Sequence, residues 1–224
     1  QGEWSGAQDW ALASYNVPVA GQHTFRWSYQ KDVSDVAGSD AAWIDSVTLP
    51  ASLTARADAS ADGKSDLFWR DAGGGLSWWL MNANVIAQSN YFNIGTEWQV
   101  RDVADLDGDG KADLVWRRAT DGANYLWTLD GAGILGYLDL GIVGLEWTLA
   151  GSADFNGDGK GDLAWRKTDG TMYVWLMNGN AIVGQGVLGA IGPEWQIQDF
   201  ADFDGDGKAD ILWRRASDGM LYTW

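Results

Sequence analysis

The chain has 224 residues, of which 46% are hydrophobic, and its 31 Asp and Glu against 15 Lys and Arg give a formal net charge of −16. This acidity argues against nucleic-acid binding, which relies on basic side chains at phosphates, and 16 Trp residues argue against disorder. The lack of cysteine excludes disulfides and thiolate chemistry. No apolar run approaches 18 residues, so we expect no membrane insertion.

Residues 1–50 carry strand patterns that do not recur later in the chain. Phe25, Trp27 and Tyr29 alternate along one predicted strand, and residues 40–49 predict another. The segment Asp-Ala-Ala-Trp-Ile-Asp-Ser-Val at 40–47 is similar to the closing strands of bacterial jelly-roll sandwiches. This resemblance implies a partial β-sandwich over residues 1–50, with Asp45 either a structural calcium ligand or a solvated strand-end residue. Fifty residues cannot bury both faces of a sandwich, so we expect other sequence or another subunit to complete it.

One motif then recurs four times. Each copy begins with alternating acidic residues and ends in Leu/Ile-x-Trp-Arg or a close variant. The closing Trp falls at 69, 116, 165 and 213, which gives spacings of 47, 49 and 48 residues. A second Trp follows at 79, 127, 175 and 224, and a third, always after Glu, lies at 98, 147 and 195. This regularity predicts a repeat protein.

Each period predicts four short strands. In the second copy, Leu114 and Trp116 share one face of a strand and Val115 and Arg117 share the other. Turns rich in Asp and Gly separate the strands, and no segment between them sustains a helical period. Four strands in about 48 residues is the size of a propeller blade, so we expect an all-β, β-propeller-type array. The predicted repeats are 51–97, 98–146, 147–194 and 195–224, about 3.6 periods.

The acidic loop of each copy predicts a calcium site. Ca²⁺ takes six to eight oxygen ligands, and alternate residues of a tight loop point inward together. In the second copy, Asp105, Asp107 and Asp109 occupy positions 1, 3 and 5, the carbonyl of Lys111 occupies position 7, and Asp113 occupies position 9. Such close carboxylates repel one another without a cation, and Mg²⁺ prefers fewer of them. The alternative is a set of polar turns that hold no ion.

The other copies predict equivalent ligands, for about four calcium ions in all, with the first site weakest. These ligands are Asp58, Ser60, Asp62, Lys64 and Asp66 in the first copy, Asp154, Asn156, Asp158, Lys160 and Asp162 in the third, and Asp202, Asp204, Asp206, Lys208 and Asp210 in the fourth. An EF-hand would need Glu at position 12, but Trp116 stands there in the second copy. The pattern is therefore an EF-hand-like loop between strands.

The Asp-x-Asp-x-Asp-Gly-x-x-Asp loops followed by Leu/Ile-x-Trp-Arg resemble the FG-GAP/VCBS repeat family of integrin-like β-propellers and bacterial surface proteins. The resemblance covers residues 51–224 and implies a propeller with calcium at each loop. The family usually closes seven blades, which is more than this segment contains. The remaining blades therefore lie outside the segment, or the array stays open and another chain covers it.

Several aromatic and charged residues allow two interpretations, one structural and one functional. Trp116, Trp127 and their equivalents predict blade packing or a sugar platform. The Arg that closes each copy is expected to stack on a neighbouring Trp or to pair with Asp. The Glu-Trp pairs join a carboxylate to a stacking face, so they are candidate carbohydrate contacts or structural residues. These ligand candidates are Glu97, Trp98, Glu146, Trp147, Glu194 and Trp195, together with Trp78, which breaks the repeat pattern and is expected to be exposed.

Nothing in the sequence favours catalysis. His23 is the single histidine, and no nucleophile elbow, zinc-protease motif or phosphate loop is present. We expect a bacterial, extracellular or cell-surface protein that acts in adhesion or in carbohydrate or protein binding. The alternatives are a structural subunit of a fibre or surface layer, completed by neighbouring chains, and an accessory region of a secreted hydrolase. Self-association or further blades at the termini are expected in either case.

Overall fold

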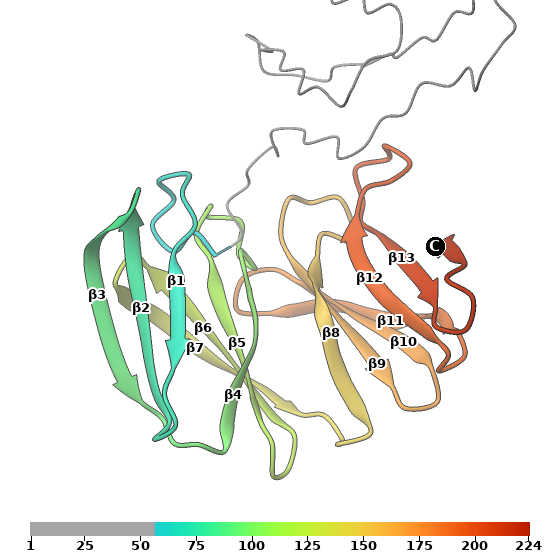
Figure 1. The fold of residues 1–224 in the computed structure, drawn as a ribbon, viewed down its shortest axis with the longest axis horizontal. Helices are drawn as coiled ribbons and strands as arrows, with labels where there is room; N and C mark the ends of the chain where they lie inside the picture. Colours follow the sequence, from blue (N-terminus) through green and yellow to red (C-terminus); the bar gives the residue numbers. More distant parts are fainter. Residues whose placement is uncertain (1–56) are drawn as a thin grey trace, which may run out of the picture. The chain divides into compact units, whose positions relative to one another are not determined.

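The computed structural model describes residues 57–224 (Figure 1). The predicted partial sandwich at 1–50, Asp45 and His23 lie outside the described residues. Within them the chain forms fourteen strands and no helix, as the turn-rich sequence predicts. Accordingly, residues 57–224 contain no helix of the length and apolarity needed to cross a membrane.

The strands form four antiparallel sheets, each a meander in which consecutive strands pair. The first sheet contains β1 (Leu67–Arg70), β2 (Gly75–Asn82) and β3 (Val85–Asn93). The second contains β4 (Trp98–Ala104), β5 (Asp113–Arg118), β6 (Ala123–Asp130) and β7 (Gly133–Ile142). The third contains β8 (Trp147–Ala153), β9 (Asp162–Lys167), β10 (Thr171–Met177) and β11 (Ile182–Ala190). The fourth contains β12 (Trp195–Ala201), β13 (Asp210–Arg215) and β14 (Leu221–Thr223).

The four strands predicted for each period occur in the second and third sheets, whereas the first and fourth have three each among the described residues. The registers repeat: Trp116 lies opposite Tyr125, and Trp165 lies opposite Tyr173. The Asp-Gly turn between β5 and β6 requires its glycine. Gly122 has φ +79°, and a Cβ there would collide with the carbonyl oxygen of Val143.

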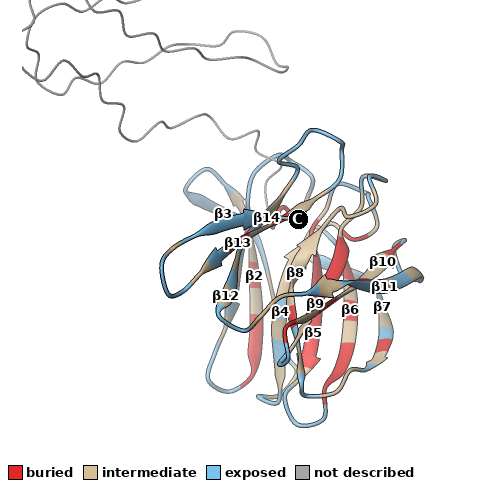
Figure 2. Ribbon diagram, turned by 90° about the vertical axis from the view of Figure 1, so that its right-hand side faces the viewer, coloured by how far each residue is buried: buried red, intermediate tan, exposed pale blue. Residues whose placement is uncertain are grey.

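Consecutive sheets pack face to face, and three apolar clusters fill the spaces between them. Trp78 and Leu76 meet Trp116 between the first and second sheets. The other clusters, which lie between the later sheets, include Val115, Leu126, Leu149, Leu163 and Trp165, and then Ala164, Met172, Ile211 and Trp213. Figure 2 shows that burial follows β2, β5 and β6, while β3 and β14 are exposed. The first strands also lie close together, because β8 contacts both β4 and β12.

Candidate functional site

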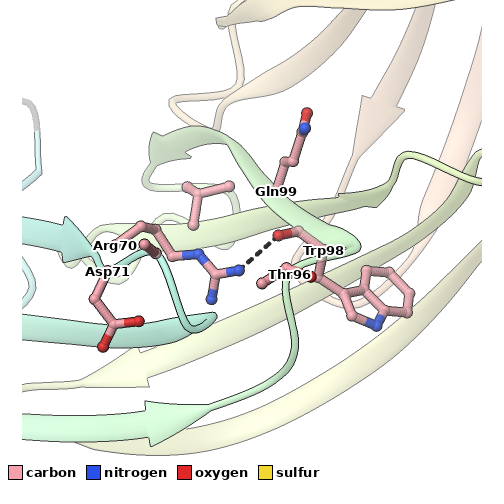
Figure 3. A pocket seen from close by; sticks show the side chains of 7 residues that line it. Arg70, Asp71, Thr96, Trp98 and Gln99 are labelled. Atoms are coloured by element: carbon pink, nitrogen blue, oxygen red, sulfur yellow. Dashed lines mark hydrogen bonds between the residues drawn. The ribbon is translucent and has the colours of Figure 1, made fainter.

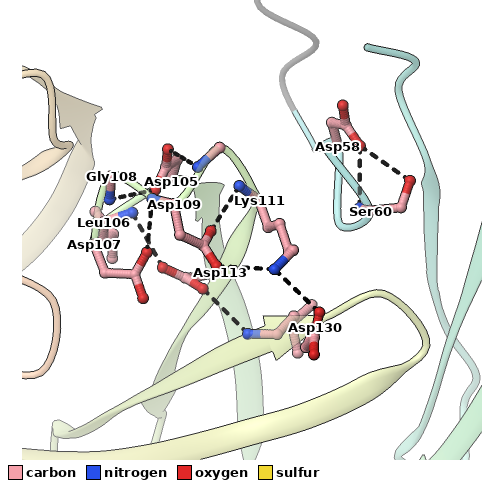
Figure 4. A network of polar contacts seen from close by, with 12 residues as sticks. Asp58, Ser60, Asp105, Leu106, Asp107, Gly108, Asp109, Lys111, Asp113 and Asp130 are labelled. Atoms are coloured by element: carbon pink, nitrogen blue, oxygen red, sulfur yellow. Dashed lines mark hydrogen bonds and ion pairs between the residues drawn. The ribbon is translucent and has the colours of Figure 1, made fainter. Parts of the chain in front are cut away.

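The second, third and fourth acidic loops join the first strand of a sheet to the second, as between β4 and β5 (Figure 4), and the first loop precedes β1. In the second loop, the carboxylate of Asp105 accepts hydrogen bonds from the backbone N–H groups of Gly108 (2.7 Å) and Gly110 (2.9 Å). Both glycines have positive φ, which curls the backbone around this carboxylate. The Asp at position 1 of the third and fourth loops accepts the equivalent pair of bonds. The Asp at position 1 therefore holds the backbone conformation of the loop by accepting hydrogen bonds from the loop's own N–H groups.

Three carboxylates converge in two of the loops. Asp105, Asp107 and Asp109 each offer an oxygen within 4.8 Å of the others, and so do Asp202, Asp204 and Asp206. Two oxygens that bind one Ca²⁺ at 2.3–2.6 Å are at most about 5 Å apart, so both groups fit that ion. Burial is the main reason that the pKa of Asp107 is raised, and the neighbouring Asp109 and Asp105 charges add to the shift. A bound cation would relieve this cost.

The first and third loops carry fewer carboxylates. In the third loop, Asn156 stands at position 3 and its amide nitrogen lies 3.2 Å from Asp158 Oδ2. In the first loop, the Ser60 hydroxyl at the same position lies 3.3 Å from Asp58 Oδ1. Amide and hydroxyl oxygens remain hard donors without charge. All four loops therefore place oxygens at positions 1, 3 and 5, but with unequal negative charge.

The Asp at position 9 lies outside these carboxylate groups. Asp113 is 1% exposed, and its two oxygens accept the backbone N–H groups of Leu106 (3.1 Å) and Leu129 (3.2 Å). Asp66 and Asp162 make the same pair of bonds in their loops. Burial raises the pKa of Asp113 to about 7 despite these bonds. In the first three loops position 9 thus ties the loop to the second strand that follows it (β2, β6 or β10), and its predicted role as a ligand stays a prediction.

The lysine at position 7 supplies positive charge to the loop. Lys111 Nζ lies 3.1 Å from Asp109 Oδ2 and 3.0 Å from Asp130 Oδ1, as Figure 4 shows. Lys64 pairs likewise with Asp62 at 2.6 Å, whereas Lys160 donates to the side chain of Asn178. The predicted metal ligand at this position is the carbonyl, so an ion pair of the side chain does not compete with it.

Three of the arginines that close the repeats, Arg70, Arg117 and Arg166, join one sheet to the next, a function that the sequence did not reveal. Arg117 donates to the carbonyl oxygens of Val143 (2.9 Å) and Gly144 (2.9 Å) in the turn before the third sheet, and to that of Trp147 (3.1 Å), the first residue of β8. Its guanidinium also lies over the Trp165 ring at 5.4 Å. The predicted stacking on a neighbouring Trp is confirmed for Arg70, Arg117 and Arg166, and Arg214 makes no such contact among the described residues. The alternative, an ion pair with Asp, is wrong for these three arginines, because their guanidinium groups donate to backbone carbonyls instead.

The Glu-Trp pairs belong to these turns. The three glutamates are exposed and the three tryptophans are half-buried. Trp98 lies between the guanidinium of Arg118, 5.0 Å from its ring, and the edge of Tyr125. Trp147 and Trp195 have the equivalent neighbours, a cation from the second strand and a tyrosine from the third. Each pair thus has a structural role, while the glutamate remains free to contact a ligand.

Two cavities share Trp98. The first, of about 320 Å³, is lined by Arg70, Asp71, Thr96 and Gln99 in addition to Trp98 (Figure 3). The second, of about 330 Å³, is aromatic, and its lining residues are Ile94, Trp98, Trp116, Tyr125, Trp127 and Tyr137. The first, polar hollow and the second, aromatic hollow therefore share one lining residue, Trp98, which the sequence predicted as a ligand contact.

Trp78 corrects one expectation. It was expected to be exposed, but it is 0% exposed and its indole N–H donates to the carbonyl oxygen of Gly131 at 3.1 Å. It lies on the face of the first sheet that packs against the second, so it cannot contact a ligand in this structure. Trp116, Trp165 and Trp213 are buried as core residues, in line with the packing interpretation, whereas Trp69, their equivalent in the first sheet, is 50% exposed.

The sheets and their loops define an all-β repeat protein with acidic clusters able to hold a metal ion. A family model described as FG-GAP-like repeat matches residues 58–116 and 154–213. The chain belongs to this family. Comparison with curated proteins found no match.

Proposed function

We propose that this chain is a non-enzymatic, extracellular calcium-binding module that acts in adhesion by binding carbohydrate. The observation that carries the calcium role is the convergence of three carboxylates in the second and fourth loops, with oxygens within 4.8 Å of one another. FG-GAP membership supports the same role and an extracellular setting, because such repeats are often calcium-binding and typically extracellular.

The proposed arrangement is that of propeller blades. Four meander sheets packed face to face, with β8 against both β4 and β12, support it, since blades of a propeller converge on their first strands. In such an arrangement the acidic loops recur at equivalent places, one per sheet. Calcium then stiffens the connection between the first and second strand of every blade.

The proposed carbohydrate site is the polar hollow at Trp98. Asp71, Thr96 and Gln99 supply hydrogen-bonding groups, and the aromatic hollow that shares Trp98 and includes the exposed Tyr137 supplies an apolar surface for a sugar ring. The exposed carboxylate of Glu97 adjoins this hollow in sequence. Trp147, with the same local packing, provides a matched control, so a glycan-array signal is expected to fall for Trp98→Ala more than for Trp147→Ala. Equal signals would contradict the site.

The calcium role is tested by counting ions with native mass spectrometry. Wild type is expected to bind about four, and Asp109→Ala to bind one fewer. Asp139→Ala is the control, because this exposed residue of β7 lies outside every acidic loop. A wild-type chain that binds no calcium, or an Asp109→Ala chain with the full count, would overturn the assignment.

A further inference from the structure

Consecutive acidic loops are joined by a hydrogen bond that recurs three times. The backbone N–H at position 8 of the later loop donates to the backbone carbonyl oxygen of the Asp at position 1 of the loop before it. The donor and acceptor pairs are Ala112 and Asp58 (2.6 Å), Gly161 and Asp105 (2.8 Å), and Ala209 and Asp154 (2.6 Å). The four loops, residues 58–66, 105–113, 154–162 and 202–210, are therefore linked in series from the first to the fourth.

Both ends of this bond lie at or beside predicted calcium ligands. Between the second and third loops, the acceptor is Asp105, whose carboxylate also holds its own loop by accepting two backbone N–H groups. The donor, Gly161, stands between Lys160, whose carbonyl is a predicted ligand, and Asp162, which ties the third loop to β10. A change in the backbone at position 1 of one loop therefore acts directly on positions 7 to 9 of the next.

The loops also pack closely enough to transmit a small shift. A Cβ added to Gly108 in the second loop would lie 3.0 Å from Cγ of Lys160 in the third. The N–H of Gly179, in the turn between β10 and β11, donates to the carbonyl oxygen of Leu106 at 3.1 Å. The second loop is thus held by the third loop and by a turn of the third sheet, so its backbone does not move independently of them.

We propose that the loops bind calcium cooperatively, each loop raising the affinity of its immediate neighbours. This coupling rests on the calcium role proposed above. An ion that orders one loop also fixes the carbonyl that holds position 8 of the next loop, so less ordering is left for the second ion to impose. By linkage, an ion in the later loop raises the affinity of the earlier loop by the same factor.

Repulsion between neighbouring ions acts in the opposite direction. Salt screens charges at a protein surface, so this repulsion weakens at physiological ionic strength. A direct hydrogen bond between the loop backbones is not screened in this way. The coupling is therefore expected to be positive in sign and to join adjacent loops.

The test measures the calcium midpoint of each loop separately, by hydrogen exchange of peptides from the full chain over a calcium titration. Asp158→Ala removes a predicted ligand from the third loop. The midpoints of the second and fourth loops are then expected to rise about fivefold or more, and that of the first loop to change less. Asp206→Ala, in the fourth loop, is expected to raise mainly the midpoint of the third. Asp139→Ala is the control and is expected to leave all four midpoints unchanged.

Replacing one backbone amide tests the hydrogen bond itself. Lactic acid in place of Ala209 turns its amide into an ester, which removes the N–H donor and keeps the methyl side chain. In this chain, Asp158→Ala is expected to raise the midpoint of the second loop as before but no longer that of the fourth.

Several results would overturn the coupling. These are midpoints of the unaltered loops that stay constant, fall, or rise equally in every loop, and a fourth loop that still responds to Asp158→Ala in the ester chain. A wild-type chain that binds no calcium by native mass spectrometry would overturn the calcium role and the coupling with it. Four ions with independent midpoints would overturn the coupling alone, so the two failures are distinguishable.

Discussion

Replacing Arg117 by alanine removes a side chain that joins the second sheet to the third through three hydrogen bonds. The guanidinium is 8% exposed and donates to four backbone carbonyls and to Oδ1 of Asn124, at 2.9–3.1 Å. The pKa of Arg117 is lowered mainly by burial, so its charge has a desolvation cost that these bonds offset. Arg214 occupies the same place in the fourth sheet and makes no such contact with any other residue of 57–224. The two arginines are therefore a matched pair.

The magnitude follows from what each substitution leaves behind. Five charge-assisted bonds at about 1.5–3 kcal/mol each overstate the loss, because alanine also removes the desolvation cost. In addition, the carbonyls of Gly122 and Gly144 keep backbone donors, the N–H groups of Val143 and Trp147. We expect Arg117→Ala to lower the free energy of unfolding by about 3–5 kcal/mol and Arg214→Ala by less than about 0.5 kcal/mol.

Urea denaturation in calcium, followed by circular dichroism on dilute protein, measures both values. For a chain of this size the Arg117→Ala loss corresponds to a melting temperature lower by about 6–20 °C. Arg117→Lys is expected to fall between wild type and Arg117→Ala, since an ammonium group lacks the planar fork that reaches several carbonyls at once. Equal losses for Arg117→Ala and Arg214→Ala, or a loss below about 1 kcal/mol for Arg117→Ala, would refute the reasoning.

Three further predictions concern the acidic loops. Chelation is expected to lower the melting temperature by tens of degrees, and calcium but not magnesium to restore it, because an ion bound only by the folded chain stabilises it; a calorimetric scan unchanged by chelator would contradict this. Asp62→Ala is expected to reduce stability in calcium less than Asp109→Ala or Asp206→Ala, since Ser60 already weakens the first loop; equal losses would make the first loop a site as good as the rest. In chelator, stability is expected to rise as pH falls from about 7 to about 4, because the raised pKa values of Asp66, Asp113 and Asp162 let the folded chain bind protons that the unfolded chain releases; denaturation midpoints that fall over this window would show the opposite linkage.

The sequence predicted the strands and turns of the repeat well because those depend on local signals. Leu114 and Trp116 alternate with Val115 and Arg117, and both faces of that strand are buried because a sheet packs on each side. The prediction that Trp78 is exposed was wrong, because its exposure depends on which face of the first sheet meets the second. The pattern of a single repeat does not indicate that face.

The candidate site likewise has features that the sequence predicts and features that it does not. The spacing of Asp105, Asp107 and Asp109 predicted their convergence, because a tight loop brings alternate residues together. The contacts of Asp113 with N–H groups 7 and 16 residues away, and those of Arg117 with carbonyls of the following turn, were not predictable. Almost every residue type has the same backbone N–H and C=O groups, so the sequence does not indicate which of them a side chain will bind. Only the folded chain shows these contacts.

The arginine contacts between sheets also have a consequence for synthesis. Each arginine emerges from the ribosome before the turn that it binds: Arg70 precedes its acceptors at Gly95 and Trp98 by 25 and 28 residues, and Arg117 precedes Trp147 by 30. A newly made sheet therefore stays incompletely anchored until the start of the next one has left the tunnel. Because each repeat contacts only its neighbours, structure is consolidated along the chain from the N-terminal side, one period behind elongation.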